Sequence, residues 1–237
     1  MTSTGTRIVV TGGEGQLAAC LKAYFPFAEY PGKRALDVSD PLACERYFSH
    51  RSVDLVIHTA AEIAYDAPLD AYWRHNVAGT VNIARVAASH GARLVYLSTD
   101  YVYPGTTGHY REDGPVQPIG SYAQSKYAGE CAALMYPDTL AIRTSFYSRL
   151  EWSCAALDAY TSRMPILDAA AYVAALSTST VTGIVNVGGP RRSLYEIVSS
   201  EFRPRTEPVS RRHMSLPYTL PEDVSLDCSK LHAVLGV

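Results

Sequence analysis

The chain has 237 residues, of which 19% are charged, and a formal net charge of −2. This length is enough to bury a sizeable core and fits one α/β domain, or one domain with a small lobe. The nearly balanced charge offers no basic surface for nucleic acid or for an anionic membrane, so a small molecule is the expected partner.

The five cysteines are scattered and form no Cys-x-x-Cys pair. This pattern favours free thiols in a reducing compartment over a disulfide framework or a zinc site, and no metal is predicted. Residues 1–7 lack the basic and apolar regions of a signal peptide, and no apolar run approaches the roughly 20 residues that span a bilayer. We therefore expect a cytoplasmic protein without a membrane segment.

The first motif is a glycine turn that follows a short apolar run. Residues 7–11 (Arg-Ile-Val-Val-Thr) predict a strand buried on both faces of a parallel sheet. Gly12, Gly15 and Ala18 then match Gly-x-x-Gly-x-x-Gly/Ala, a turn that lets the backbone approach a pyrophosphate at the N-terminus of the next helix. We predict dinucleotide binding at this turn, with a purely structural turn as the alternative.

The segment that would distinguish NAD from NADP is irregular, so the second strand is hard to place. An acidic residue at the end of that strand holds a ribose 2′-hydroxyl, whereas basic residues hold a 2′-phosphate. Glu29 favours the first cofactor, and Lys33 with Arg34 favours the second. The preference stays open at this stage. Asp37 and Val38 could face an adenine ring or belong to a capped loop.

Strands and helices alternate as far as residue 144. The expected order is a strand end running into a helix capped by Asp40 with Pro41 in its first turn, a strand at 54–61, a helix at about 69–89, a strand at 93–98, a helix from 122 and a strand at 139–144. This alternation predicts an α/β fold, a Rossmann-type doubly wound parallel sheet with helices on both faces. His58 lies on a buried strand and is expected to be a core histidine without a catalytic role.

The pattern loosens after Ser145. Helices are expected at 152–157 and 169–176, a strand at 183–187, and a helix that opens with a capping box at Ser193. We expect residues 1–145 to form the NAD(P)-binding domain and residues 146–237 to form a small C-terminal substrate lobe. This lobe would be interleaved with the last strands of the sheet, so that the two form one compact unit.

Tyr122 and Lys126 are the candidate acid/base pair. A spacing of four residues puts both side chains on one face of a helix, about 5–6 Å apart at Cβ. A neighbouring cation favours the phenolate and lowers the pKa of the phenol, which suits acid/base work at a carbonyl or an alcohol; a solvated helix face is the alternative. Thr99 falls at the carboxyl end of a strand, where open parallel sheets bind ligands. A loop rich in Gly, Pro and Tyr separates Thr99 from the pair.

Several motifs, in this order, resemble the extended short-chain dehydrogenase/reductase family, and within it the dTDP-4-dehydrorhamnose reductases. They are Thr11-Gly-Gly-Glu-Gly-Gln-Leu-Ala18, Ala35-Leu-Asp-Val-Ser-Asp40, Asn76-Val-Ala-Gly-Thr80, Leu97-Ser-Thr-Asp-Tyr-Val-Tyr103, Tyr110-Arg-Glu-Asp113, Tyr122-x-x-x-Lys126 and Arg143-Thr-Ser145. The resemblance covers residues 7–145 well and returns weakly at 183–231.

The resemblance implies a role for each matched position. Tyr122 would donate the proton, Lys126 would hold the nicotinamide ribose and lower the pKa of the tyrosine, and Thr99 would bond the substrate oxygen. The implied cofactor contacts, to NADP or NAD, are Gly12, Gly15, Gln16, Leu17, Asp37, Val38, Ala60, Ala61, Asn76, Ser98, Tyr122, Lys126 and Thr144. Substrate contacts are predicted for Asp100, Tyr101, Tyr103, Arg149, Trp152 and Arg163.

The leading hypothesis is therefore NAD(P)H-dependent reduction of the keto group of a sugar nucleotide, in which Tyr122 neutralises the developing alkoxide. Related 4,6-dehydratases carry a glutamate where this chain has Tyr101, which disfavours dehydration. The segment 145–176 is shorter than in typical family members, and this bears on the substrate. The alternatives are an NAD-dependent sugar-nucleotide epimerase and a non-catalytic NAD(P)-binding regulatory subunit, like one of methionine adenosyltransferase. The expected partner is a nucleotide-sugar-like small molecule, and a homodimer is the assembly considered.

Overall fold

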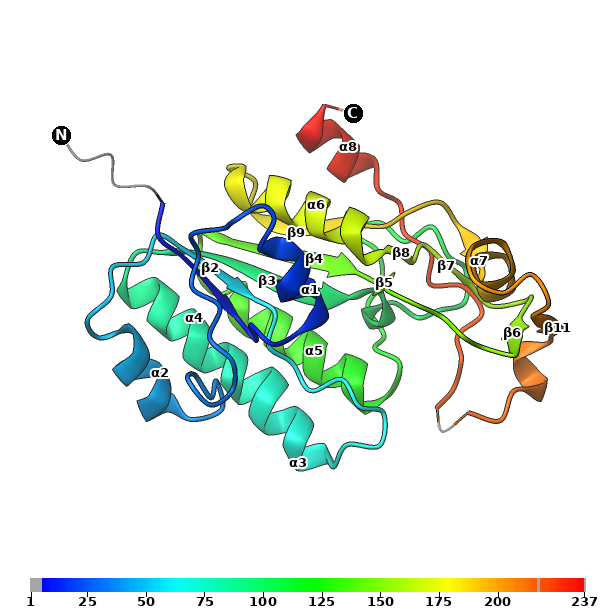
Figure 1. Ribbon diagram of the computed structural model, residues 1–237, viewed down its shortest axis with the longest axis horizontal. Helices are drawn as coiled ribbons and strands as arrows, with labels where there is room; N and C mark the ends of the chain where they lie inside the picture. The colour runs from blue at the N-terminus through cyan, green and yellow to red at the C-terminus, as the bar shows by residue number, and fades with distance from the viewer. Residues whose placement is uncertain (1–5, 217, 237) are drawn as a thin grey trace.

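The computed structural model describes residues 6–216 and 218–236, so the predictions for residues 1–5 lie outside the described residues. Within them, the centre of the molecule is a five-stranded parallel sheet in the order β1-β2-β3-β4-β9 (Figure 1). Its strands are β1 (Ile8–Thr11), β2 (Leu55–His58), β3 (Arg93–Thr99), β4 (Thr139–Thr144) and β9 (Gly183–Val187). Every residue of β2 and β4 is buried, as strands covered on both faces require.

Helices cover both faces of this sheet (Figure 1). One face packs against α1 (Gln16–Leu21), α6 (Ile166–Thr178) and α8 (Ser229–Leu235). The other packs against α2 (Pro41–Phe48), α4 (Gly79–Ser89) and α5 (Gly120–Ala133). Alternate residues of each strand enter the two cores: Val9 and Val56 lie on one side, and Val10 and Ile57 on the other. The predicted Rossmann-type fold is confirmed.

The strand that was expected between α1 and α2 is reduced to a single bridging residue, Glu29. Glu29 forms an isolated bridge with Val9, in which its N–H donates to the Ile8 carbonyl at 2.9 Å and its carbonyl accepts from the Val10 N–H at 2.8 Å. The chain thus passes from β1 through α1 to one edge of β1, and then crosses to β2 at the other edge. The direction of winding reverses at β1, and such a reversal is where doubly wound sheets bind ligands.

The predicted helix at 69–89 is confirmed, with a π-helical segment inside it. It consists of α3 (Leu69–Tyr72), the π-helical η1 (Trp73–Ala78) and α4. The helix before it, α2, begins as expected: Asp40 accepts hydrogen bonds from the backbone N–H groups of Leu42 and Ala43 behind Pro41. The strand end predicted just before that cap is wrong, because residues 36–40 form a loop.

The remaining short elements build a small lobe beside the sheet. They are β5 (Phe146–Tyr147), β6 (Cys154–Ala156), β7 (Tyr160–Thr161), β8 (Met164–Pro165), β10 (Arg192–Ser193), α7 (Leu194–Glu201), β11 (Glu207–Val209) and the 3-10 turn η3 (Arg211–His213). The strands pair as β5 with β8, β6 with β11, and β7 with β10. Between these pieces in sequence lie α6, which packs on the central sheet, and β9, which is one of its strands, so residues 146–237 contribute to both units. The division at residue 145 stays a prediction.

One element of the lobe was predicted wrongly. Residues 152–157 were expected to be helical, but β6 is a strand whose Ala155 and Ala156 pair with Pro208 and Val209 of β11. Both alanines are fully buried, so a distant partner and burial override a local preference for helix. The helix at 169–176, the strand at 183–187 and the capping box at Ser193 are all confirmed.

Candidate active site

A cleft of about 560 Å³ opens at the carboxyl ends of β1 to β4. Most of the predicted site residues line it: Gly15, Gln16, Leu17, Ala61, Ser98, Thr99, Asp100, Tyr101, Tyr122, Lys126, Thr144 and Arg163. They come from α1, from the loops and strand ends that follow β2, β3 and β4, from α5, and from the turn between β7 and β8. The sheet therefore gathers onto one edge residues that are up to 148 positions apart in the chain.

The glycine turn forms one wall of the cleft. Gly12 has φ +67°, in the left-handed region, and the Gly15 N–H donates to its carbonyl at 2.8 Å. A side chain at Gly12 would also lie 2.8 Å from Cα of Ala60, so the two small residues pack against each other behind the cleft. Gly12 and Ala60 shape the turn without lining the cleft, while Gly15 and Gln16 line it where α1 begins.

Thr99, Tyr122 and Lys126 all line this one cleft. Thr99 ends β3, and its hydroxyl donates to Oδ1 of Asp100 at 3.2 Å. Tyr122 and Lys126 lie one turn apart on α5. The Lys126 ammonium lies 4.3 Å from the centre of the Tyr96 ring, which gives the buried ammonium a cation–π contact.

Burial decides the protonation of this pair. It raises the pKa of Tyr122 well above the usual value near 10, and the nearby Tyr65 and Asp100 add to the effect while the Thr99 hydroxyl and Arg163 oppose it. Burial also lowers the pKa of Lys126 to about 7. The loss of hydration of the phenolate outweighs the opposing influence of the Thr99 hydroxyl and Arg163, and the lowering of this pKa by Lys126 that the resemblance implies stays a prediction. Tyr122 is a protonated phenol at neutral pH.

Asp100 lies directly beside these groups. Its side chain is buried, and Oδ2 has no hydrogen-bond partner in the part of the chain that the structure describes. Burial raises the pKa of this carboxyl to about 6, against the opposing influence of the Arg163 guanidinium. The guanidinium itself is fixed by a bond of 3.0 Å from its Nε to the Ser145 hydroxyl. The far end of the cleft thus presents a titratable acid and a held cation.

Asn76 lies behind the cleft and does not line it, contrary to the prediction of a cofactor contact. Its Oδ1 accepts from the Glu62 N–H at 2.7 Å, and its Nδ2 donates to the Glu62 carbonyl at 3.0 Å and to the Ser125 hydroxyl at 2.9 Å. Ser125 in turn donates to the Tyr122 carbonyl at 2.7 Å. All of the polar atoms of the amide are engaged, so Asn76 clamps α5 to the loop after β2.

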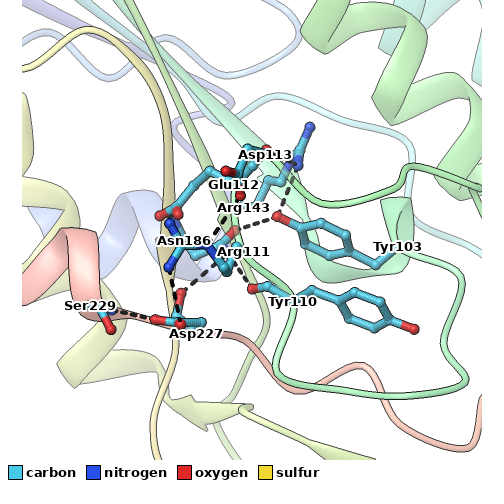
Figure 2. Close-up of polar contacts among 9 residues, drawn as sticks. All are labelled: Tyr103, Tyr110, Arg111, Glu112, Asp113, Arg143, Asn186, Asp227 and Ser229. Carbon is cyan, nitrogen blue, oxygen red and sulfur yellow. Dashed lines mark hydrogen bonds and ion pairs between the residues drawn. The ribbon is translucent and has the colours of Figure 1, made fainter.

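Tyr103 was predicted to touch substrate, and this prediction is wrong. Its side chain is fully buried. Its hydroxyl accepts from Nη1 of Arg143 at 2.9 Å and donates to Oδ1 of Asn186 at 2.9 Å (Figure 2). The ring stacks on Tyr110 with 4.8 Å between the centroids. Tyr103 therefore ties β4 and β9 to the loop that follows Thr99.

This network continues to both sides of Tyr103. Arg143 forms a buried ion pair with Glu130 of α5 at 2.6 Å, and Glu130 also accepts from the Ser98 hydroxyl at 2.6 Å. On the other side, Nδ2 of Asn186 donates to the carbonyls of Tyr110 and Asp227 (Figure 2). The long loop and the C-terminal tail are thus held to the sheet beneath the cleft. The sequence signal for this network was Arg143 inside the apolar run of β4, because a charged residue in a buried strand needs a partner of opposite charge.

Arg149 and Trp152, two further predicted substrate residues, do not line the cleft. Arg149 has a side chain 78% exposed and pairs with Glu151, and Trp152 packs among the apolar residues of the small lobe. Asp37 and Val38 also lie outside the cleft: Asp37 accepts hydrogen bonds from Ser39, and Val38 is buried. Their role at an adenine ring stays a prediction.

Other residues line the cleft without having been predicted. They are Glu14, Ala18, Thr59, Ile63, Tyr65, Leu97, Ser145 and Phe146. Ser145 and Phe146 directly follow the carboxyl end of β4, so the strand-end rule that selected Thr99 would also have selected them. His58 is a core histidine as expected: it is fully buried, its ring nitrogens bond the hydroxyls of Thr11 and Thr80, and burial lowers its pKa to about 3.

Residues 6–216 and 218–236 contain no helix that is both long and apolar enough to cross a bilayer. The same residues contain no group of three or more His, Cys, Asp or Glu side chains placed to hold a metal ion.

Comparison with known proteins agrees with this geometry. Residues 6–151 match the family model described as RmlD substrate binding domain. The dTDP-4-dehydrorhamnose reductase of Mycobacterium tuberculosis (strain ATCC 25618 / H37Rv) is 35% identical over 162 residues, which cover 62% of this chain and 52% of that protein. Methionine adenosyltransferase 2 subunit beta of Xenopus laevis is 28% identical, with 98% of this chain and 83% of that protein covered. The chain spans about half the length of the first of these relatives.

Solved structures show the same fold. The dTDP-4-dehydrorhamnose reductase from Bacillus anthracis str. Ames superposes with a TM-score of 0.86 at 24% identity, covering 98% of this chain and 93% of that one. A hypothetical dTDP-4-dehydrorhamnose reductase from Sulfolobus tokodaii gives a TM-score of 0.85 at 25% identity, covering 98% and 96%. The matched family model spans more than half of the residues and includes the glycine turn, Thr99, Tyr122 and Lys126. The chain belongs to the RmlD substrate binding domain family, within the extended short-chain dehydrogenases/reductases.

Proposed function

We propose that this protein reduces the keto group of a sugar nucleotide with NADPH or NADH. The observation that carries the proposal is the meeting of Thr99, Tyr122 and Lys126 in one cleft beside the glycine turn. The curated relatives named dTDP-4-dehydrorhamnose reductase support this reaction class. Among similar structures, the Bacillus anthracis reductase is in complex with NADP, and the Bordetella bronchiseptica enzyme WbmG is in complex with NAD.

The residues of the cleft fit a dinucleotide. Gly12 and Gly15 place no side chain between the backbone at the start of α1 and a pyrophosphate, and Gly15 lines the cleft there. Thr144 lines the cleft, and its buried hydroxyl has no hydrogen-bond partner among the described residues. A buried polar atom without a partner costs free energy unless a ligand bonds it. We infer that Gly15, Gln16 and Leu17 hold the pyrophosphate and that Lys126 and Thr144 hold the nicotinamide end.

The chain's own residues then provide the acid. A bound nicotinamide supplies a hydride to a carbonyl carbon next to it. Tyr122 enters the reaction as a protonated phenol, because burial raises its pKa, and it gives its proton to the oxygen on which negative charge develops. Lys126 lies one turn away and stabilises the resulting phenolate. When Asp100 is protonated, the Thr99 hydroxyl is free to donate to the same substrate oxygen and to orient it toward Tyr122.

Tyr122→Phe tests the proposal. We expect turnover of a keto-sugar nucleotide, followed by NADPH or NADH absorbance, to fall by orders of magnitude, while the coenzyme Kd from nicotinamide fluorescence stays near the wild-type value. Tyr127→Phe is the matched control, because Tyr127 lies on the same helix and does not line the cleft. Wild-type turnover in Tyr122→Phe, or no coenzyme binding by the wild type, would overturn the proposal.

A second candidate is a non-catalytic regulatory subunit. It is favoured by the match to methionine adenosyltransferase 2 subunit beta, which covers nearly the whole chain. The intact Tyr122 and Lys126 in a shared cleft favour the enzyme instead. An epimerase, the third candidate, would retain NAD through purification and would catalyse no net reduction.

The proposal includes a cytoplasmic location and a homodimeric assembly. A cytoplasmic location is supported by the five cysteines, all of which are free. A homodimer stays a prediction, which sedimentation of the purified protein would test.

A further inference from the structure

We propose that the Arg163 guanidinium binds a carboxylate on the sugar ring of the substrate, so that the preferred substrate is the nucleotide derivative of an acidic sugar. This inference rests on the proposed function and narrows its substrate class. Among the described residues that line the cleft, the cations are Lys126 and Arg163, and the anions are Glu14 and Asp100. Lys126 lies one turn from Tyr122 and is assigned to the nicotinamide end. Arg163 is therefore the cation that remains for the substrate.

The Arg163 side chain is held at its base and free at its tip. Its Nε donates to the Ser145 hydroxyl at 3.0 Å, and its backbone N–H donates to the Thr161 hydroxyl at 3.0 Å. The next residue, Met164, donates its N–H to the Ser145 carbonyl at 3.2 Å. Within residues 6–216 and 218–236, no hydrogen bond or ion pair engages Nη1 or Nη2 of Arg163. These two nitrogens form a planar fork that matches the two oxygens of a carboxylate.

Asp100 does not neutralise this cation by contact. The two side chains form neither an ion pair nor a hydrogen bond, although both line the cleft. Burial raises the pKa of Asp100 to about 6 in spite of the Arg163 guanidinium, whereas a carboxylate in contact with an arginine has its pKa lowered. Oδ2 of Asp100 also has no partner among the described residues. The charge of Arg163 is therefore left for a ligand to match.

This charge reaches the groups that surround the reacting carbonyl. Burial raises the pKa of Asp100, Tyr101 and Tyr122, and the Arg163 guanidinium opposes the rise at all three. In a pyranose, the carboxyl group of a uronic acid is attached to the ring carbon next to the fourth carbon, whereas the anomeric carbon that bears the diphosphate lies across the ring. A sugar that is reduced at its fourth carbon beside Tyr122 therefore turns its carboxyl group toward the neighbours of Tyr122. The diphosphate is the rival anion.

Calorimetric titration of the purified protein, saturated with NADP or NAD, compares ligands that share one nucleotide: UDP, UDP-glucose and UDP-glucuronate. UDP-galactose and UDP-galacturonate repeat the comparison for the other configuration of the fourth carbon. These sugars are alcohols, which stand on the product side of a reduction and keep their carboxyl group.

For the configuration that the cleft accepts, we expect the wild type to bind the uronate about tenfold or more tightly than the neutral sugar. A neutral sugar leaves the guanidinium without a partner, and a site built to bond a polar group discriminates against the analogue that lacks it. Arg163→Met should remove this difference by weakening the uronate alone, and its unchanged Kd for the neutral sugar shows that the cleft is folded.

Two further variants make the comparison specific. Arg163→Lys keeps the charge without the planar fork and should retain only part of the difference. Arg205→Met is the matched control, because it removes the same charge from an exposed position between α7 and β11 outside the cleft. It should bind every ligand as the wild type does.

Each other result overturns the inference. If Arg163→Met weakens UDP, the neutral sugar and the uronate equally, Arg163 binds the diphosphate. If it weakens none of them, Arg163 only balances the charge of Asp100. Wild-type protein that binds uronate and neutral sugar alike has no preference for an acidic sugar. These three results leave the proposed function standing, whereas no saturable binding of coenzyme or of any nucleotide sugar removes it together with the inference.

Discussion

The Thr99 hydroxyl donates a hydrogen bond of 3.2 Å to Oδ1 of Asp100 and accepts one of 3.3 Å from the Tyr101 N–H. Its single hydrogen is therefore committed to a carboxylate and is not available to a substrate oxygen. If Asp100 is protonated, the acid can donate to Thr99 instead, and the Thr99 hydrogen becomes free to bond the substrate. The protonation of Asp100 thus sets the direction in which Thr99 donates.

Asp100→Asn should therefore change the pH profile of the reaction. Burial raises the pKa of Asp100 to about 6, so in the wild type the carboxyl loses its proton, and Thr99 its free hydrogen, as pH rises through 6. We expect kcat/KM to fall across that range by a factor of about 2–10, which corresponds to the net free energy of one hydrogen bond to the substrate. The asparagine amide donates at every pH and should remove this fall.

Asp100→Leu is the control, since leucine can neither donate nor accept, and its activity should be low at every pH. The other ionisable groups that face Asp100 are Arg163, Tyr65, Tyr101 and Tyr122. Burial raises the pKa of each tyrosine, and the pKa of Arg163 is also raised, so none of them titrates near pH 6. Lys126 lines the same cleft with a pKa of about 7 and is present in both proteins, so only the part of the fall that Asp100→Asn removes belongs to Asp100. A fall that persists in Asp100→Asn would show that another group is responsible.

Lys126→Met should stabilise the protein at low pH, although it removes a catalytic group. Burial lowers the pKa of Lys126 from its usual value near 10.5 to about 7. Between these two values the unfolded chain binds more protons than the folded one, so this lysine makes stability rise with pH from about 7, and its full cost is present below that. The cost is on the order of a few kcal/mol.

Melting temperatures of the protein without coenzyme, from about pH 6 to pH 10, measure this effect. We expect the Lys126→Met variant to melt above the wild type at the acid end, and the difference to shrink as pH rises. Lys22→Met, at an exposed lysine, should show no such trend. A difference that is constant across the range would mean that the ammonium is not destabilised by burial.

Structural features that depend on residues close together in the sequence were predictable. The glycine turn, the Asp40 cap, the capping box at Ser193 and the spacing of Tyr122 from Lys126 each depend on residues within one or two turns of one another. The positions of the buried strands along the chain were also predictable, because buried parallel strands are continuous apolar runs. These features bring Thr99, Tyr122 and Lys126 to one cleft, and their catalytic roles stay predictions.

Features that depend on distant partners were not predictable. Tyr103 sits one turn after Asp100 in a motif that reads as catalytic, yet Arg143 and Asn186 draw it into the core from strands 40 and 83 residues away. Asn76 was assigned to the cofactor because it lies in a family motif, and its amide is instead used up by Glu62 and Ser125. In both cases the side chain that looked available is bonded by groups that no local pattern reveals.

The buried pair of Glu130 and Arg143 should behave as a unit in unfolding experiments. Both side chains are at most 2% exposed, and their shortest contact is 2.6 Å. Arg143→Met leaves the buried carboxylate of Glu130 with the Ser98 hydroxyl as its one remaining partner among the described residues, and we expect it to lower the free energy of unfolding by about 3–5 kcal/mol.

The double variant Glu130→Met with Arg143→Met tests this coupling by urea denaturation. Removing both charges should cost less than the sum of the two single changes, because neither is left unpaired. If the losses simply add, the pair contributes no specific interaction, and the two residues act through independent packing.

The clamp formed by Asn76 should affect catalysis through the position of Tyr122. Asn76→Ala removes the bonds to Glu62 and Ser125, and we expect a loss of stability of about 1–3 kcal/mol because buried backbone groups are left without partners. Since Ser125 bonds the Tyr122 carbonyl, kcat should fall about tenfold or more while the coenzyme Kd changes little. Ser125→Ala breaks the same chain at its second link and should lower kcat in the same sense. A coenzyme Kd that rises in proportion to the loss of kcat would instead place Asn76 in contact with the cofactor, as the family motif had implied.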